Sequence, residues 1–163
     1  SHSETSGFDQ LVFGNYIASV TSMFRNKTTL SQVPKWIDGL PYGDWPVYLW
    51  TIVQGGKIRY FDTCTAVYRR EIGTSASLRT DHFRGMRVNR TILRFMLADA
   101  HFESKKEQIK AAILQLDQNL MLHQVKYGSK WIGSFQFVAL WLRKPSLKLI
   151  RKFGKAFLRS FKK

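Results

Sequence analysis

The sequence is poor in acidic residues, has one cysteine and lacks a long apolar run. It contains 11 Asp and Glu against 26 Lys and Arg in 163 residues, which gives a formal net charge of +15. The single cysteine, Cys64, excludes an internal disulfide, and its apolar neighbours predict a buried thiol in a reducing compartment. The longest apolar-rich stretch, residues 131–142, is shorter than the roughly 20 residues of an ordinary membrane span. No P-loop, dinucleotide-binding fingerprint or nucleophile elbow is present.

What the chain does contain predicts an ordered domain with an uneven distribution of charge. A hydrophobic share of 44% and an aromatic share of 14% argue for a real core and against disorder. Asp117 is the last acidic residue, and 11 of the 26 basic residues follow it. The positive excess therefore belongs mainly to the C-terminal part of the chain rather than to its body.

Local patterns predict a mixed first half and a helical second half. We expect a short helix or turn at residues 8–13, a strand at 15–24, a loop with a helical turn at 27–42 and a helix at 45–53. Strands are predicted at 57–61 and 63–68, and one long helix at about 104–125. A row of arginines recurs at helical spacing and fits either a solvated face or contact with phosphate or lipid headgroups; it consists of Arg84, Arg87, Arg90 and Arg94.

The last 18 residues, 146–163, have the pattern of a strongly amphipathic helix. At about 100° per residue, the apolar and the cationic side chains separate onto two faces. Such a separation is typical of a helix that lies at a membrane surface. Docking on the chain's own domain and nucleic-acid binding are the alternatives, although no nucleic-acid recognition motif accompanies the charge. We therefore expect an anionic membrane surface, and not nucleic acid, as the partner of Lys148, Arg151, Lys152, Phe153, Lys155, Phe157, Arg159 and Phe161.

An isolated carboxylate stands in the stretch PYGDWPVYLW, residues 41–50. Asp44 precedes Trp45 and Pro46, which fits the N-cap of a helix, and a carboxylate at a helix N-terminus is held in place and favoured as the anion. Such a group can also accept a proton as a general base. Its aromatic neighbours are either core residues or a wall for a bound sugar; they are Trp36, Trp45, Tyr48 and Trp50.

Several short motifs in one order carry a family resemblance. GNYI, FR, PKW, GDWP, GGKI and VYR follow one another within residues 8–80, and together they resemble the C-terminal half of the catalytic domain of family 2 glycosyltransferases. The resemblance implies an α/β fold of the GT-A, Rossmann-like type. Residues 1–80 would form the C-terminal half of that domain without its nucleotide-binding half, residues 81–145 a helical extension, and residues 146–163 a basic amphipathic tail helix.

The resemblance also implies a reaction. It is an inverting transfer of a sugar from a nucleotide-diphosphate sugar to a glycan or a lipid-linked acceptor, with Asp44 as the general base. Gly14, Asn15, Gly43 and Trp45 would lie at the substrates. A divalent cation, Mg²⁺ or Mn²⁺, would neutralise the leaving diphosphate.

The sequence departs from the family's pattern in two places. Glu71 stands where the family commonly has a His that binds the metal, so Glu71 is the metal-ligand candidate, with a surface charge as the alternative. The family's D-x-D motif is absent, and no room for nucleotide-binding units precedes Phe8. We therefore expect the C-terminal part of a longer enzyme, inactive alone, cytoplasmic and peripheral at the inner face of the membrane. The alternative function is a non-catalytic basic protein that binds a membrane surface or a polyanion.

Overall fold

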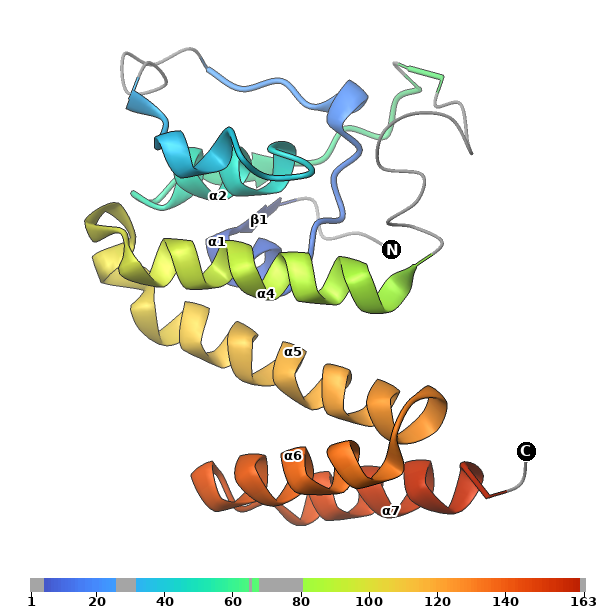
Figure 1. Cartoon of the computed structure of the whole chain (residues 1–163). Coiled ribbons are helices and arrows are strands. Elements are labelled where there is room, and N and C mark those ends of the chain that lie inside the picture. The colour runs from blue at the N-terminus through green and yellow to red at the C-terminus, as the bar shows by residue number, and fades with distance from the viewer. Residues whose placement is uncertain (1–4, 26–31, 65, 68–80, 162–163) are drawn as a thin grey trace. The chain divides into compact units, whose positions relative to one another are not determined.

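Helices dominate the computed structural model, which describes residues 5–25, 32–64, 66–67 and 81–161 (Figure 1). Helix accounts for 67% of the structure and strand for 4%. In chain order the helices and helical turns are α1 (Phe8–Leu11), η1 (Ser19–Thr21), η3 (Lys35–Ile37), α2 (Asp44–Ile52), α4 (His82–Ala98), η4 (Ala100–Lys105), α5 (Lys106–Tyr127), α6 (Lys130–Arg143) and α7 (Leu147–Arg159).

The predicted α/β fold is wrong. The described residues contain one two-stranded antiparallel sheet, in which β1 (Thr5–Gly7) pairs with β2 (Lys57–Arg59), and no Rossmann-like parallel sheet. The physical reason lies in the strands themselves. Parallel sheets are covered on both faces and need apolar runs, whereas β2 has only three residues and exposes its two charged ends.

Two more strand predictions are wrong for the described residues. Residues 15–24 contain a bend and the turn η1 instead of a strand. Here the hydroxyls of Thr21 and Ser22 donate to the carbonyls of Ala18 and Ser19, at 2.8 and 3.0 Å, and these local bonds favour a turn over a ladder. The described positions within 63–68 are likewise outside any strand, and Cys64 is exposed rather than buried.

The helix α2 forms where the sequence predicts it. The expectation that Asp44 is the N-cap is wrong: Gly43 is the N-cap and Asp44 is the first residue of the helix. Pro46 lies in the first turn, where a backbone N–H is not needed. The predicted face is buried, with Trp45, Leu49 and Val53 in the core. The chain leaves the helix through Gly55, whose φ of +98° favours glycine, and then enters β2.

The helix α4 also agrees with the prediction of a helical second half. Its N-cap is Asp81, whose carboxylate accepts a hydrogen bond of 2.9 Å from the backbone N–H of Arg84. Ile92, Leu93 and Met96 are fully buried, while Arg84 lies on the exposed side of the helix.

The chain separates into two compact units, one up to Ala112 and one from Ile113 onward. The second unit contains the later part of α5 together with α6 and α7. Its core is a cluster of five buried side chains contributed by all three helices: Met121, Val125, Leu140, Leu149 and Ala156. The predicted division at residues 80 and 145 stays a prediction.

Candidate functional site

The carboxylate of Asp44 is held from two sides at the start of α2. Its Oδ1 accepts a hydrogen bond of 2.8 Å from the backbone N–H of Trp45, and its Oδ2 accepts one of 3.3 Å from the side-chain amide of Asn15. The side chain is half-buried, so it is both oriented and accessible. Each carboxylate oxygen has two lone pairs, and both oxygens keep capacity to accept a further proton or hydrogen bond.

Asn15 reaches Asp44 from the turn that follows α1. The backbone N–H of Gly14 bonds to the carbonyl of Leu11 at 3.1 Å, which turns the chain back on itself. The Oδ1 of Asn15 then accepts a hydrogen bond of 3.0 Å from the backbone N–H of Ile17. This Asx-type turn fixes the side chain, so its amide NH₂ points at the carboxylate.

Two other predicted substrate residues, Gly43 and Trp45, are packed against the protein interior. Trp45 is 1% exposed, and its indole N–H donates a 2.8 Å hydrogen bond to the carbonyl of Leu11. Trp45 thereby ties the start of α2 to the end of α1. A Cβ added to Gly43 would lie 3.3 Å from the side chain of Ile37, so the backbone there is closely approached. Both residues support the position of Asp44.

Tyr42 belongs to the same neighbourhood, and the sequence analysis did not single it out. Its hydroxyl donates a hydrogen bond to the Oδ1 of Asn89 on α4. Burial, and secondly the negative charge of Asp44, raise the pKa of Tyr42 from 10.0 to about 12. The sequence could have pointed to Tyr42, because it lies only two residues before Asp44 and the charge of a near neighbour affects the pKa of a titratable group.

The aromatic residues near Asp44 in the sequence belong mostly to the core and do not form an exposed wall. Trp45, Tyr48 and Trp50 are buried, and Trp50 stacks on His101 with a centroid distance of 4.5 Å. The half-buried Trp36 stacks on Phe95 and donates its indole N–H to Asp99. These four are core or framework residues. The exposed aromatic side chains on either side of Asn15 are Phe13 and Tyr16.

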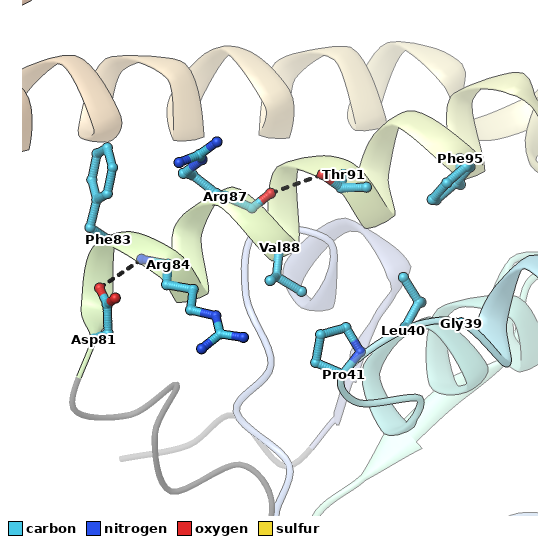
Figure 2. Close-up of a pocket in the computed structure, with 10 residues that line it drawn as sticks. All are labelled: Gly39, Leu40, Pro41, Asp81, Phe83, Arg84, Arg87, Val88, Thr91 and Phe95. Atoms are coloured by element: carbon cyan, nitrogen blue, oxygen red, sulfur yellow. Dashed lines mark hydrogen bonds between the residues drawn. The ribbon is translucent and has the colours of Figure 1, made fainter.

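A hollow in the described surface lies elsewhere, between the loop before α2 and one side of α4 (Figure 2). Its volume is about 600 Å³. Figure 2 shows the guanidinium group of Arg84 extended on the side of Pro41, and a hydrogen bond of 3.1 Å from the Thr91 hydroxyl to the Arg87 carbonyl. Asp44 does not line this hollow, so it is not part of the candidate site.

The predicted metal ligand, Glu71, lies outside the described residues. Within 5–25, 32–64, 66–67 and 81–161, no three His, Cys, Asp or Glu side chains come close enough to hold a metal ion. The candidate site therefore rests on Asp44 and Asn15 without a described cation site.

The predicted membrane residues of α7 fall into three groups. Its cationic side chains are exposed, including Lys148, Lys152 and Lys155. Phe153 and Phe157 are half-buried against the core cluster of the second unit. Phe161 is exposed. The predicted apolar face of the tail is thus partly used for docking on its own unit.

Neither protein-family models nor curated proteins nor solved structures match the chain. In the part of the chain that the structure describes, every helix is too short or too polar to cross a membrane.

Proposed function

We propose that this chain carries the acceptor side of an inverting glycosyltransferase, with Asp44 as the general base. The observation that carries the proposal is the contact between Asn15 and Asp44. These residues are 29 positions apart, and the family resemblance places both at the substrates. The structure holds them 3.3 Å apart, with the carboxylate oriented by a second bond from the backbone of Trp45.

In the proposed reaction, the hydroxyl of the acceptor lies against the free lone pairs of Asp44. The carboxylate takes the hydroxyl proton while the acceptor oxygen forms its bond to the anomeric carbon. The bond between that carbon and the diphosphate oxygen breaks, and its electron pair leaves with the diphosphate. Attack from the face opposite the leaving group inverts the configuration at the anomeric carbon. A carboxylate fixed at two points is suited to this role because it does not need to reorient.

Two exposed aromatic residues close to Asn15 in the sequence are candidates for contact with an acceptor. Phe13 and Tyr16 flank Asn15 and expose their rings, and a ring face can pack on the apolar side of a sugar. The acceptor class that we propose is a glycan or a lipid-linked glycan. The nucleotide sugar, and the divalent cation expected with it, would be held by residues other than those the structure describes.

The proposed function depends on the geometry of Asp44 and Asn15 and not on a parallel sheet, because function depends on the site more than on the fold around it. The test is sugar transfer by the complete product of the gene, with Asp44→Asn as the variant. Asn keeps the size of the side chain and an oxygen for the Trp45 N–H, but it is not a general base. We expect kcat to fall by about 10²–10⁴-fold, with a thermal unfolding midpoint close to that of the wild type.

The matched control is Asp38→Asn, which removes the same charge from an exposed aspartate at the end of η3. Its kcat should equal that of the wild type. Transfer by Asp44→Asn within threefold of the wild-type rate would remove Asp44 from the role of base and with it the proposal.

A further inference from the structure

The helix α6 carries a line of large apolar side chains on its outer side. Trp131 is 87% exposed and Phe135 78% exposed, and Val138 and Leu142 are exposed as well. Their spacing of four, three and four residues aligns them along one side of the helix. We call these four residues the α6 stripe. A contiguous apolar surface of this kind marks an interaction site more often than ordinary solvent-facing surface.

The opposite side of α6 is used for packing inside the second unit. Gly133 lies so close to α5 that a Cβ there would stand 3.0 Å from the backbone nitrogen of Val125. Leu140 joins the buried cluster, and Phe137 stacks on Phe153 of α7 at a centroid distance of 4.1 Å. The helix α6 therefore packs on α5 and α7 through the side opposite the α6 stripe, and the stripe is not needed for the core of the second unit.

The helix α7 divides its apolar residues in the same way. Leu149 and Ala156 join the buried cluster, and Phe153 and Phe157 pack against it, so these four residues dock α7 on its own unit. The outer apolar residues are exposed; they are Leu147, Ile150, Leu158 and Phe161.

The helices α6 and α7 are antiparallel neighbours in the second unit. The Nζ of Lys130, at the start of α6, lies 3.6 Å from the ring centre of Phe161, just beyond the end of α7, so the helices run antiparallel. On α6 the stripe lies roughly opposite the buried Gly133 and Leu140. On α7 the exposed apolar residues lie between the buried face and the basic arc of the helix. Figure 1 shows α6 and α7 side by side.

Positive charge borders the exposed apolar residues of α7. At about 100° per residue, the exposed basic residues of α7 occupy the arc that adjoins Leu158. Asp117 is the one acidic residue of the sequence from 113 to 163, against 11 Lys and Arg. A partner that fits must accept apolar side chains and carry negative charge. A second copy of the chain would bring an equally positive unit against the first, which Coulomb repulsion opposes.

We infer that the second unit lies in the plane of an anionic lipid surface, with the α6 stripe and the outer residues of α7 inserted between headgroups. Lys and Arg side chains at the border keep their charges at the level of the phosphates, and tryptophan favours the same interfacial depth. The sequence pattern predicted membrane contact by the tail helix alone. The structure adds the exposed apolar side chains of α6 to the proposed contact surface. The inference does not depend on the proposed sugar transfer.

The experiment is co-sedimentation of the full chain with phosphatidylcholine vesicles, with and without phosphatidylserine, over a range of salt concentrations. We expect binding that requires phosphatidylserine. The variant Trp131→Ser/Phe135→Ser should bind about tenfold more weakly, because it removes two inserted side chains. Both residues are exposed, so circular dichroism should report an unchanged helix content. Lys152→Gln/Lys155→Gln should bind roughly ten- to thirtyfold more weakly and lose part of the salt dependence.

The control is Met23→Ser/Phe61→Ser, which removes two exposed apolar side chains from the first unit and should leave vesicle binding unchanged. Three results would overturn the inference. One is a wild-type chain that ignores the anionic vesicles. Another is vesicle binding that the Trp131/Phe135 variant retains in full, which would leave electrostatic attraction as the sole cause. The third is a wild-type dimer, dissolved by the Trp131/Phe135 variant, that binds no vesicles, which would assign the stripe to a second copy.

Discussion

The side-chain amide of Asn15 lies 3.3 Å from the Oδ2 of Asp44 and joins the turn after α1 to the first residue of α2. One hydrogen bond thereby connects two segments that the chain places far apart. The Oδ1 of Asn15 is engaged at the same time by the backbone N–H of Ile17, so the amide group cannot rotate freely. Asn15 is therefore a positioning residue for the carboxylate.

Removal of this amide should slow the proposed reaction without unfolding the protein. We expect Asn15→Ala to lower kcat of the complete gene product by about tenfold, because one hydrogen bond to a charged group is lost. The control is Asn119→Ala, which deletes an exposed asparagine side chain on α5. Steady-state kinetics on both variants decide the matter, and equal rates for the two would separate Asn15 from the function of Asp44.

The raised pKa of Tyr42 predicts an alkaline loss of stability. A tyrosine whose pKa is 10.0 when unfolded and about 12 when folded stabilises the fold fully below pH 10, and this contribution is lost as the pH rises towards 12. Such a shift would correspond to about 2–3 kcal/mol of unfolding free energy for a fully buried group, and solvent screening reduces it to about 1 kcal/mol for the half-buried Tyr42. Urea unfolding at several pH values between 8 and 12 should show the decline, and Tyr42→Phe should flatten it.

The same tyrosine reports the charge of Asp44. Because that charge is the smaller of the two causes of the shift, Asp44→Asn should lower the pKa of Tyr42 only part of the way to 10.0. A carbon-13 NMR titration of the tyrosine ring carbons measures this directly. A pKa that is identical in the wild type and in Asp44→Asn would mean that the two groups do not interact.

The close approach of α6 to α5 at Gly133 should make this position intolerant of a side chain. A Cβ there would meet the backbone and side chain of Val125, so we expect Gly133→Ala to cost about 1–3 kcal/mol in unfolding free energy. Gly154→Ala is the matched control, because a Cβ there meets no atom within 4 Å. It should stabilise α7 by about 0.5–1 kcal/mol. Chemical denaturation followed by circular dichroism measures both, and a neutral Gly133→Ala would contradict the packing described.

The buried indole of Trp45 should matter more than the exposed indole of Trp131. In Trp45→Phe the carbonyl of Leu11 loses its 2.8 Å donor inside the core, for a cost of about 1–3 kcal/mol. Trp131→Phe makes the same chemical change on an exposed side chain and should stay within about 0.5 kcal/mol. Urea unfolding curves of the two variants test the difference, and equal midpoints would argue against the burial of Trp45.

Helices were predictable from this sequence because their signals are local. The buried face of α2, with Trp45 and Leu49, follows from spacing alone, and so does the extent of α5 to within a few residues. Strands depend on a partner that sequence periodicity does not reveal. At residues 15–24 the alternation was present, but the hydroxyls of Thr21 and Ser22 formed turns instead.

The roles of the site residues stay predictions, and the structure adds how those residues are packed. Asp44 and Asn15 are in contact, Trp45 is buried behind them, and Tyr42 joins the neighbourhood with Asn89 of α4 as its partner. Burial is a property of tertiary packing, so a tryptophan in an aromatic-rich stretch can be wall or core with the same sequence pattern. For the same reason the exposed side of α6 was not distinguishable from a core helix.

The exposed thiol of Cys64 allows the chain to be labelled at a single position. It is the sole thiol of the sequence, and it belongs to the first unit. A maleimide fluorophore attached there would leave every residue of α6 and α7 chemically untouched. Its anisotropy decay on vesicles would then measure the tumbling of the first unit while the helical layer of the second unit is at the lipid.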